Sequence, residues 1–226
     1  MRRRALLVVF VVSLLIVAYG AYVVSYPKYP EVKGCINPFL AVKPLSKTQE
    51  RWSEIHVFFK LVTTRNFWKM TKPWDVDYSH VMIAKHIVEY HGKKITMLAI
   101  GVPLKDKKHI IALYEFSKPV QGVKLVTYEY LVDGPILHTI KAGINGKIKT
   151  VSSSCTQECQ SNSDCGAFGE CNWYCCSIDW SKVIPCCGGC VFAGELSPVC
   201  ALIFCPMCVY NACSWGSYCS GWTPGP

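Results

Sequence analysis

Positive charge is almost absent from the last third of the sequence, and cysteine is absent from its middle. Residues 155–226 contain one basic residue, Lys182, against five acidic ones, whereas residues 1–154 carry a net charge of +13. Residues 36–154 contain no cysteine, although the chain has 15. The middle region therefore has no disulfides of its own, and the change of charge and cysteine content near residue 150 marks a domain boundary.

The sequence also lacks the short motifs of several large enzyme classes. It has no HExxH, no GxSxG and no glycine-rich phosphate loop, which argues against zinc proteases, α/β-hydrolases and P-loop proteins. Asp75 and Asp77 are explained by a loop or a helix cap as well as by acid–base chemistry. The histidines are scattered along the chain at His56, His80, His86, His91, His109 and His138. The sequence thus predicts a protein that is not an enzyme, with no catalytic residue and no cofactor.

Charge is missing from one further stretch, residues 5–25, which follows three arginines. A basic start before an apolar run is typical of an export signal. About 20 residues at about 1.5 Å each would also cross a bilayer core of about 30 Å. Residues 1–25 are therefore predicted to be either a cleaved signal peptide or a membrane anchor. The arginines place the rest of the chain outside, either secreted or on the extracellular face of the cell membrane.

Residues 26–150 are predicted to form a β-rich, basic domain. Apolar residues at helical spacing indicate one amphipathic helix within residues 46–70, with a strand at 55–63 as the alternative. Six strands are predicted after it, at about 81–90, 94–102, 108–116, 122–132, 135–142 and 146–152. Turn signals such as Asp133-Gly134 and Asn145-Gly146 favour an antiparallel meander. About 125 residues are enough to bury a core without covalent help.

Residues 151–226 are predicted to form a small, acidic, apolar and cysteine-rich domain. Fourteen cysteines within residues 155–226 have the density of an exported disulfide scaffold. The candidates for disulfides are Cys155, Cys159, Cys165, Cys171, Cys175, Cys176, Cys186, Cys187, Cys190, Cys200, Cys205, Cys208, Cys213 and Cys219. Because the number is even, all of them can pair, which stabilises a domain too small for a large core. Cys35 is left over and is either free or linked to a second chain.

Together these regions predict an α+β fold. It consists of an N-terminal hydrophobic helix, an antiparallel β-meander domain with about one helix, and a small disulfide-rich C-terminal domain. The polar stretch at residues 150–154 suits an exposed linker, in which Ser152 is the candidate processing site.

The spacing of four cysteines allows a different interpretation. Cys187, Cys190, Cys205 and Cys208 have nearly the spacing of a four-thiolate zinc knuckle, and the last two have the CPxC form of a redox dithiol. In the oxidising environment outside the cell, these thiols would form disulfides with one another or with the surrounding cysteines before a metal binds. The sequence therefore favours disulfides and predicts no metal site, and a metal or redox protein is the weaker alternative.

The two domains differ in charge, and we expect the basic middle domain to bind the acidic tail. No motif of a nucleic-acid reader accompanies the basic charge, so no nucleic-acid partner is predicted. Within residues 183–226 the only charged residue is Glu195. Apolar residues there, such as Leu202 and Trp215, would form either a face that contacts a target membrane or the small core around the disulfides.

An export signal, a region without cysteines and a cysteine-rich tail from Cys155 to Cys219 follow one another in this chain. This architecture resembles the precursors of the microhalocins, the archaeal peptide bacteriocins. The resemblance implies that the tail is released as an antimicrobial peptide and that residues 26–150 are its immunity or pro region. We therefore expect an exported bacteriocin precursor whose middle domain masks the peptide. The alternative is a structural or adhesive cell-surface protein, anchored by its first helix and ending in a disulfide-hardened tip.

Overall fold

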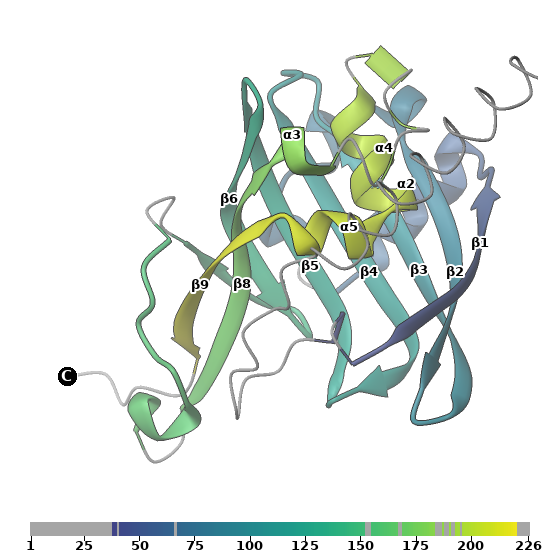
Figure 1. Cartoon of the computed structure of the whole chain (residues 1–226). Coiled ribbons are helices and arrows are strands. Elements are labelled where there is room, and N and C mark those ends of the chain that lie inside the picture. Colours follow the sequence, from purple (N-terminus) through teal and green to yellow (C-terminus); the bar gives the residue numbers. More distant parts are fainter. Residues whose placement is uncertain are drawn as a thin grey trace, which may run out of the picture. The chain divides into compact units, whose positions relative to one another are not determined.

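Antiparallel strands form one sheet that extends through most of the described chain (Figure 1). The computed structural model describes residues 38–220 apart from residues 40, 66, 152–154, 167–168, 184–186, 188–189, 191–192 and 195. The strands are β1 (Lys43–Glu50), β2 (Met82–Tyr90), β3 (Lys93–Pro103), β4 (His109–Val120), β5 (Val123–Asp133), β6 (Ile136–Ile144), β7 (Lys147–Thr150), β8 (Glu170–Asp179) and β9 (Cys213–Ser220). Their order is β1-β2-β3-β4-β5-β6-β8-β9, and β7 pairs with β6 off this path.

Tight turns join neighbouring strands where the sequence predicts them. In His91-Gly92, Gln121-Gly122 and Asn145-Gly146 both residues have positive φ angles, between 47° and 80°. This is the backbone of two-residue hairpin turns, whose twist matches that of the flanking strands. The antiparallel meander predicted for this region is therefore confirmed.

The segment before β2 differs from the prediction of one helix within residues 46–70. Residues 43–50 form β1, an edge strand paired with β2. β1 is exposed along almost its whole length, so its sequence has no alternation of apolar residues that would indicate a strand. The helix, α2 (Glu54–Thr63), is shorter than predicted and begins after Ser53, whose side chain accepts a hydrogen bond from the backbone N–H of His56. The alternative of a strand at 55–63 is wrong.

The first face of the sheet is covered by α2 and by three single-turn 3₁₀ helices, η1 (Phe67–Lys69), η2 (Pro73–Asp75) and η3 (Tyr78–His80). Val57, Leu61 and Phe67 of these elements pack against Ile100 of β3 and Leu113 of β4. All buried members of this cluster lie between residues 57 and 113. The middle region thus supplies this core without the cysteine-rich tail.

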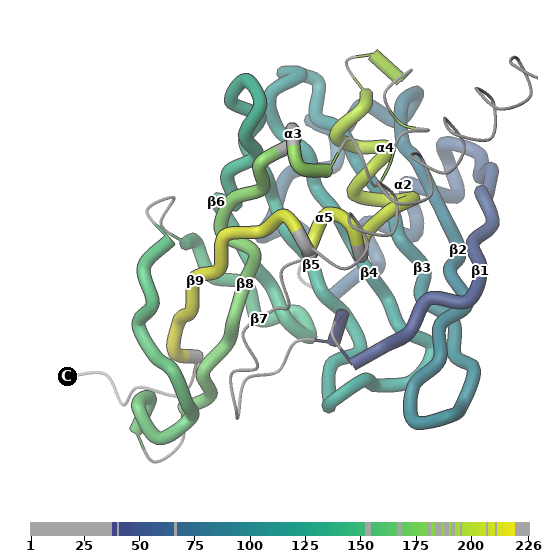
Figure 2. The backbone as a smooth tube through the Cα atoms, in the orientation of Figure 1, coloured from purple at the N-terminus to yellow at the C-terminus, as the bar shows by residue number. Residues whose placement is uncertain are grey.

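The second face is covered by the C-terminal part of the chain. Helices α4 (Ser197–Phe204) and α5 (Pro206–Asn211) lie in front of the sheet in Figures 1 and 2, and α4 contacts β2, β3 and β4. The short helices α3 (Trp180–Val183) and η4 (Asn162–Cys165) also belong to this part. The middle region thus supplies the core of the first face, and the C-terminal part supplies the cover of the second.

The sheet continues across the predicted domain boundary at residue 150. β6 pairs with β8 over three residue pairs, from Ile136–Asp179 to His138–Ser177. Residues 32–226 belong to one compact unit, and the division at residue 150 stays a prediction. The predicted N-terminal helix and Cys35 lie outside the described residues. Within the described part of the chain, no helix is both long and apolar enough to cross a membrane.

Candidate interface between the sheet and the cysteine-rich region

Helix α4 lies closest to the sheet where the strands carry small side chains. We call residues 38–151 the sheet region and residues 155–220 the cysteine-rich region. A Cβ atom on Gly101 of β3 would lie 2.5 Å from Cγ1 of Ile203 and 2.7 Å from Cγ1 of Val199. Ala112 of β4 pairs with Gly101 and so faces the same side of the sheet. Because these two side chains are small, α4 packs closer to the sheet than it could against larger side chains.

The last turn of α4 receives hydrogen bonds from side chains of the sheet region. The final carbonyl groups of a helix have no partner within the helix. Tyr114 of β4 donates its hydroxyl hydrogen to the carbonyl of Leu202, with an oxygen–oxygen distance of 2.8 Å. Nε2 of His86 in β2 lies 2.7 Å from the carbonyl oxygen of Ile203. Because a carbonyl oxygen only accepts, this nitrogen carries the proton and donates it.

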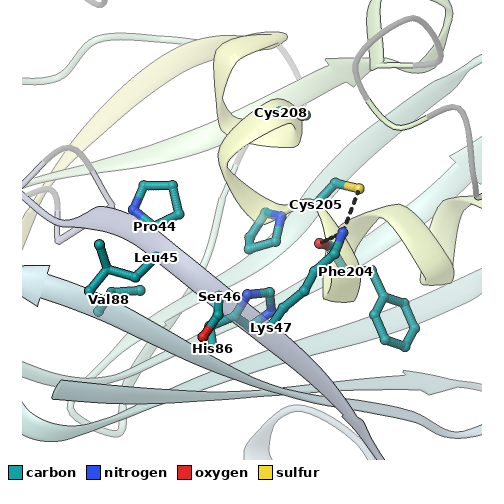
Figure 3. Close-up of a pocket in the computed structure, with 10 residues that line it drawn as sticks. Pro44, Leu45, Ser46, Lys47, His86, Val88, Phe204, Cys205 and Cys208 are labelled. Atoms are coloured by element: carbon teal, nitrogen blue, oxygen red, sulfur yellow. Dashed lines mark hydrogen bonds between the residues drawn. The ribbon is translucent and has the colours of Figure 1, made fainter. Parts of the chain in front are cut away.

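Lys47 of β1 completes the series. Its Nζ donates to the carbonyl of Phe204 at 2.9 Å and lies 3.9 Å from Sγ of Cys205 (Figure 3). A positive charge at the C-terminal end of a helix is also stabilised by the helix dipole. Three successive carbonyl groups of α4 are thus bonded by side chains from three strands, which fixes both the position and the rotation of the helix on the sheet.

His86 is buried, with 5% of its surface exposed. Desolvation lowers the pKa of its imidazole, the carbonyl of Ile203 acts in the opposite direction, and the charge of Lys47 lowers the pKa further. The ring is therefore neutral at neutral pH. Beside it, a cavity of about 320 Å³ lies between β1 and the start of α5 and is lined by Leu45 and Pro206 among others (Figure 3).

Tyr210 of α5 anchors the second contact between the two regions. Its ring stacks on Phe39 with a centroid distance of 4.1 Å, and it lies 5.9 Å from Tyr114 and 6.1 Å from Tyr128. Burial raises the pKa of the Tyr210 hydroxyl well above its usual value. Because the three partners belong to the sheet region, this apolar cluster joins the regions without any covalent bond.

Charged side chains meet near β7 and β8. Nζ of Lys149 lies 2.9 Å from a carboxylate oxygen of Glu158 and 4.9 Å from the ring centroid of Tyr218. Nζ of Lys147 lies 4.0 Å from a carboxylate oxygen of Glu170. In these pairs the base comes from the sheet region and the acid from the cysteine-rich region. Among the described residues, these two pairs bring opposite charges together between the regions, both at exposed positions, and the predicted binding of the two regions stays a prediction.

All six described disulfides join cysteines of the cysteine-rich region. They are Cys155–Cys176, Cys159–Cys171, Cys165–Cys219, Cys175–Cys213, Cys187–Cys205 and Cys190–Cys200. Cys208 is disulfide-bonded too. Every described cysteine is therefore oxidised, and the prediction of a disulfide-rich C-terminal region is confirmed. Cys186 lies outside the described residues.

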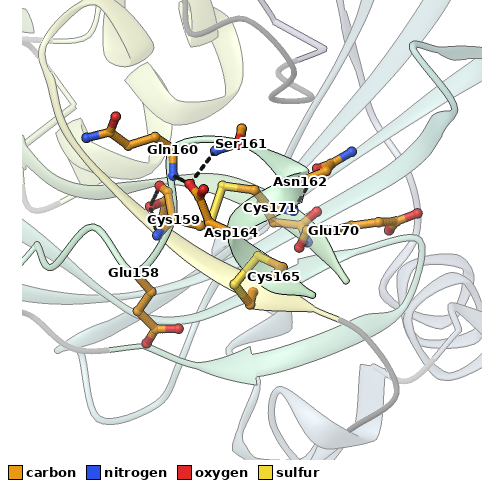
Figure 4. The surroundings of a disulfide bond; sticks show 12 residues. Glu158, Cys159, Gln160, Ser161, Asn162, Asp164, Cys165, Glu170 and Cys171 are labelled. Atoms are coloured by element: carbon orange, nitrogen blue, oxygen red, sulfur yellow. Dashed lines mark hydrogen bonds between the residues drawn. A yellow bond between two sulfur atoms is a disulfide. The ribbon is translucent and has the colours of Figure 1, made fainter. Parts of the chain in front are cut away.

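The loop before β8 shows how these disulfides work with local hydrogen bonds (Figure 4). One disulfide links Cys159 to Cys171 at the start of β8, and another links the loop to β9. The carboxylate of Asp164 accepts hydrogen bonds from the backbone N–H groups of Gln160 and Ser161 at 2.7 and 2.9 Å. These bonds lower the pKa of the Asp164 carboxyl. The loop is thus fixed by covalent and polar contacts instead of a large core.

No disulfide can join strands β1 to β7 to the cysteine-rich region, because residues 36–154 contain no cysteine. Within residues 43–155, only the backbone joins these strands covalently to Cys155. The candidate processing site, Ser152, lies outside the described residues. A cut at this point would leave all six described disulfides on the C-terminal side.

Among the described cysteines, two groups of sulfur atoms are close enough to hold a metal ion if they were reduced. Cys187, Cys190 and Cys205 form one group, and Cys159, Cys165 and Cys219 form the other. The first group contains three members of the predicted zinc knuckle but not Cys208. All of these cysteines are in disulfides, and a disulfide sulfur cannot act as the thiolate ligand that zinc requires.

The residues that define this interface were not identified from the sequence. In the sequence, His86 is one of six scattered histidines, and Lys47 falls within the predicted helix. The useful signal was Gly101, because a glycine within a strand often marks a close approach of another backbone. His80 and His109 instead bond nearby acids, Asp77 and Asp106. The prediction that the protein is not an enzyme stays a prediction.

The chain matches no protein-family model, and comparisons with curated proteins and with solved structures also find no match.

Proposed function

We propose that this chain is the exported precursor of a disulfide-rich antimicrobial peptide. The cysteine-rich region is the peptide, and the sheet region binds it and masks its apolar helix until release. The proposal follows the likeness in architecture to microhalocin precursors, in which the region before the peptide gives immunity.

The observation that carries the proposal is the way α4 is held. Val199, Leu202 and Ile203 of this helix are buried, and its last carbonyl groups accept hydrogen bonds from the sheet region. A released peptide would expose these groups to water or to lipid. The sheet region thus supplies both the apolar cover and the polar cap that a masking domain needs.

The covalent pattern supports release. A single backbone cut within residues 152–154 would separate the described strands β1 to β7 from a peptide that keeps its own disulfides. Such a peptide would keep its fold outside the cell, because cross-links restrict its unfolded chain. The described residues on the two sides of the cut would then be joined by the noncovalent interface alone, which can dissociate.

The disulfides also bear on location, since bonds of this kind persist in oxidising compartments and are typical of extracellular proteins. We place the protein outside the cell or on the extracellular face of the membrane, with residues 1–25 as signal peptide or anchor. After release, the apolar side of α4 would contact the membrane of a target cell.

The alternative is a cell-surface structural or adhesive protein with a hardened tip. It is favoured by the pairing of β6 with β8 and by the single compact unit of residues 32–226, because a permanent tip must stay attached. A metal or redox function is weaker, since the described cysteines are all in disulfides.

The first test is the mass of the species found outside producing cells. A peptide that begins near Ser152, with its cysteines oxidised, is expected for the precursor. A full-length or anchored chain would favour the surface protein and contradict the proposal.

The second test introduces a specific protease site into residues 152–154 of the full chain. After the cut, the two parts should elute together in size-exclusion chromatography and leave liposomes and indicator cells intact. The separated C-terminal part should permeabilise liposomes or kill the cells, and adding back the sheet region should protect them. A separated part that harms neither would overturn the proposal.

A further inference from the structure

Five large apolar side chains are exposed on the side of the sheet region that faces away from α4. They are Ile55, Phe58, Phe59, Trp68 and Trp74, which we call the aromatic surface, with exposed fractions from 39% to 70%. They lie on α2, η1 and η2, which cover the first face of the sheet, whereas α4 covers the second. Clustered exposure of this kind marks an interaction site more often than chance.

Ring contacts and hydrogen bonds hold these side chains together as a surface. The rings of Trp68 and Trp74 meet edge to face at a centroid distance of 6.1 Å. The ring of Phe58 lies 6.1 Å from that of Tyr78, whose hydroxyl donates to the carbonyl of Pro73 at 2.9 Å. Pro73 precedes Trp74 in η2, so these contacts connect α2 to the tryptophan pair.

Helix α2 is apolar on both of its sides. Val57 and Leu61 are buried in the core, while Ile55 and Phe59 are 70% and 59% exposed. A helix that faces water is normally polar on its outer side. The outer side of α2 is therefore suited to an apolar partner and not to solvent.

Three lysine side chains lie beside the tryptophan pair. Lys69, Lys72 and Lys105 line a cavity of about 510 Å³ together with Trp68. Nζ of Lys72 also lies 5.7 Å from the ring centroid of Trp74. The loop that carries Lys105 is tied to η2, because its backbone N–H donates to the carbonyl of Asp75 at 2.8 Å.

The acidic groups at the same cavity are mostly paired. Asp106 bonds His109 at 2.5 Å, and Glu129 lies 2.8 Å from Nζ of Lys141. Asp75 is the remaining acid in the lining, against the three lysines. The charge available to a partner at this rim is therefore positive.

We infer that the aromatic surface docks on a membrane that contains anionic lipids. Tryptophan and phenylalanine enter the boundary between headgroups and acyl chains, while nearby lysines bind the phosphates. A protein partner fits less well, because lysine is depleted at protein–protein interfaces. The cysteine-rich region, on the other face of the sheet, would remain accessible while the surface is docked.

The position of the apolar run in the chain agrees with this partner. Residues 26–37 lie between the run and the first described residue, and twelve residues span at most about 40 Å. Where the run is retained as an anchor, the sheet region is thus held within this distance of a bilayer. A weak docking surface would then be occupied at a high local concentration of lipid.

The experiment uses residues 32–226, which form a compact unit, so that the apolar run cannot insert by itself. Sedimentation would compare vesicles of phosphatidylcholine with vesicles that contain equal parts of phosphatidylcholine and phosphatidylglycerol. Binding to the anionic vesicles should be at least about tenfold stronger, since each lysine near such a surface contributes about 1 kcal/mol. The double variant Trp68→Ser, Trp74→Ser should weaken this binding by about tenfold or more.

Matched variants distinguish binding through the aromatic surface from nonspecific attraction between lysines and anionic lipid. Lys69→Gln with Lys72→Gln should weaken binding to anionic vesicles by about thirtyfold. Lys93→Gln with Lys94→Gln, which removes the same charge beside another exposed turn, should change the binding little. All variants should show the melting temperature of the parent. Phe59→Ser provides a second apolar change in case the tryptophan variant is less stable.

Three results would overturn the inference. The first is that residues 32–226 bind neither kind of vesicle, and the second is that the tryptophan variant binds as well as the parent. The third is a dimer in the absence of lipid that the tryptophan variant dissociates, because the surface would then be covered by a second copy of the chain. None of these results bears on whether the cysteine-rich region is released as a peptide.

Discussion

The sheet region and the cysteine-rich region are stabilised by different means. The sheet region has long strands, a packed core under α2 and no cysteine in residues 36–154. The cysteine-rich region is shorter, and its described cysteines are all in disulfides. The larger region relies on hydrophobic burial, whereas the smaller one has cross-links that offset the entropy of its unfolded chain.

Each region is also incomplete at the surface that contacts the other. The sheet region lacks a cover for its second face, on which Tyr114, Ala99 and Gly101 lie. The cysteine-rich region lacks a cap and an apolar cover for α4. Each region therefore supplies what the other lacks, although no described disulfide connects them.

Reduction of the disulfides should have the largest effect and should act on one region first. Each lost cross-link costs about 2–4 kcal/mol, and six of them are described within the cysteine-rich region. Hydrogen exchange with mass spectrometry should show β8 and β9 unprotected in reductant, while amides of β3 and β4 stay partly protected. Equal loss of protection in both regions would mean that the sheet region has no stability of its own.

A substitution at the closest contact should weaken the interface without touching the disulfides. In Gly101→Val the new side chain would overlap Ile203 and Val199, and we expect a loss of about 1–3 kcal/mol in the free energy of unfolding. Denaturant titration measures it. The control is Thr96→Val, which places a valine on the other face of β3. Equal stability of the two variants would contradict the close packing of α4 on the sheet.

The sequence predicts those parts of the molecule that depend on local signals. Turn glycines and apolar runs indicate the strands from β2 to β7, and the density of cysteines indicates the disulfides. β1 was missed because its side chains are exposed and polar, so its only strand signal is the pairing with β2. The interface was missed because its bonds join distant residues; His86 and Ile203 are 117 positions apart.

Acid should weaken the interface through His86. Desolvation lowers the pKa of the folded imidazole, while in the unfolded chain it is about 6.5. The unfolded state therefore binds the proton more readily. The stability contributed by the neutral imidazole is complete above about pH 6.5 and falls as the pH drops toward the folded pKa, by at most about 2 kcal/mol at pH 5.

The variant His86→Gln isolates this group, because glutamine keeps an N–H donor for the carbonyl of Ile203 but does not titrate. Unfolding free energies at pH 7 and pH 5 would be compared between parent and variant. The parent should lose more stability on acidification. An identical loss in both would assign the pH dependence to other groups.

The smallest expected effect lies at the exposed charges between the two regions. Nζ of Lys149 is 2.9 Å from Glu158, but their side chains are 40% and 49% exposed, so water and salt screen the pair. Lys149→Gln should reduce the free energy of unfolding by about 0.5 kcal/mol or less, and the difference should shrink at high salt, where the Debye length falls to about 3 Å.

Lys147→Gln is the matched control, because its Nζ is 4.0 Å from Glu170 and 72% of its side chain is exposed. This variant should change the stability even less. A loss well above about 1 kcal/mol for Lys149→Gln that disappears in high salt would mean that opposite charge contributes more to holding the two regions together than expected here.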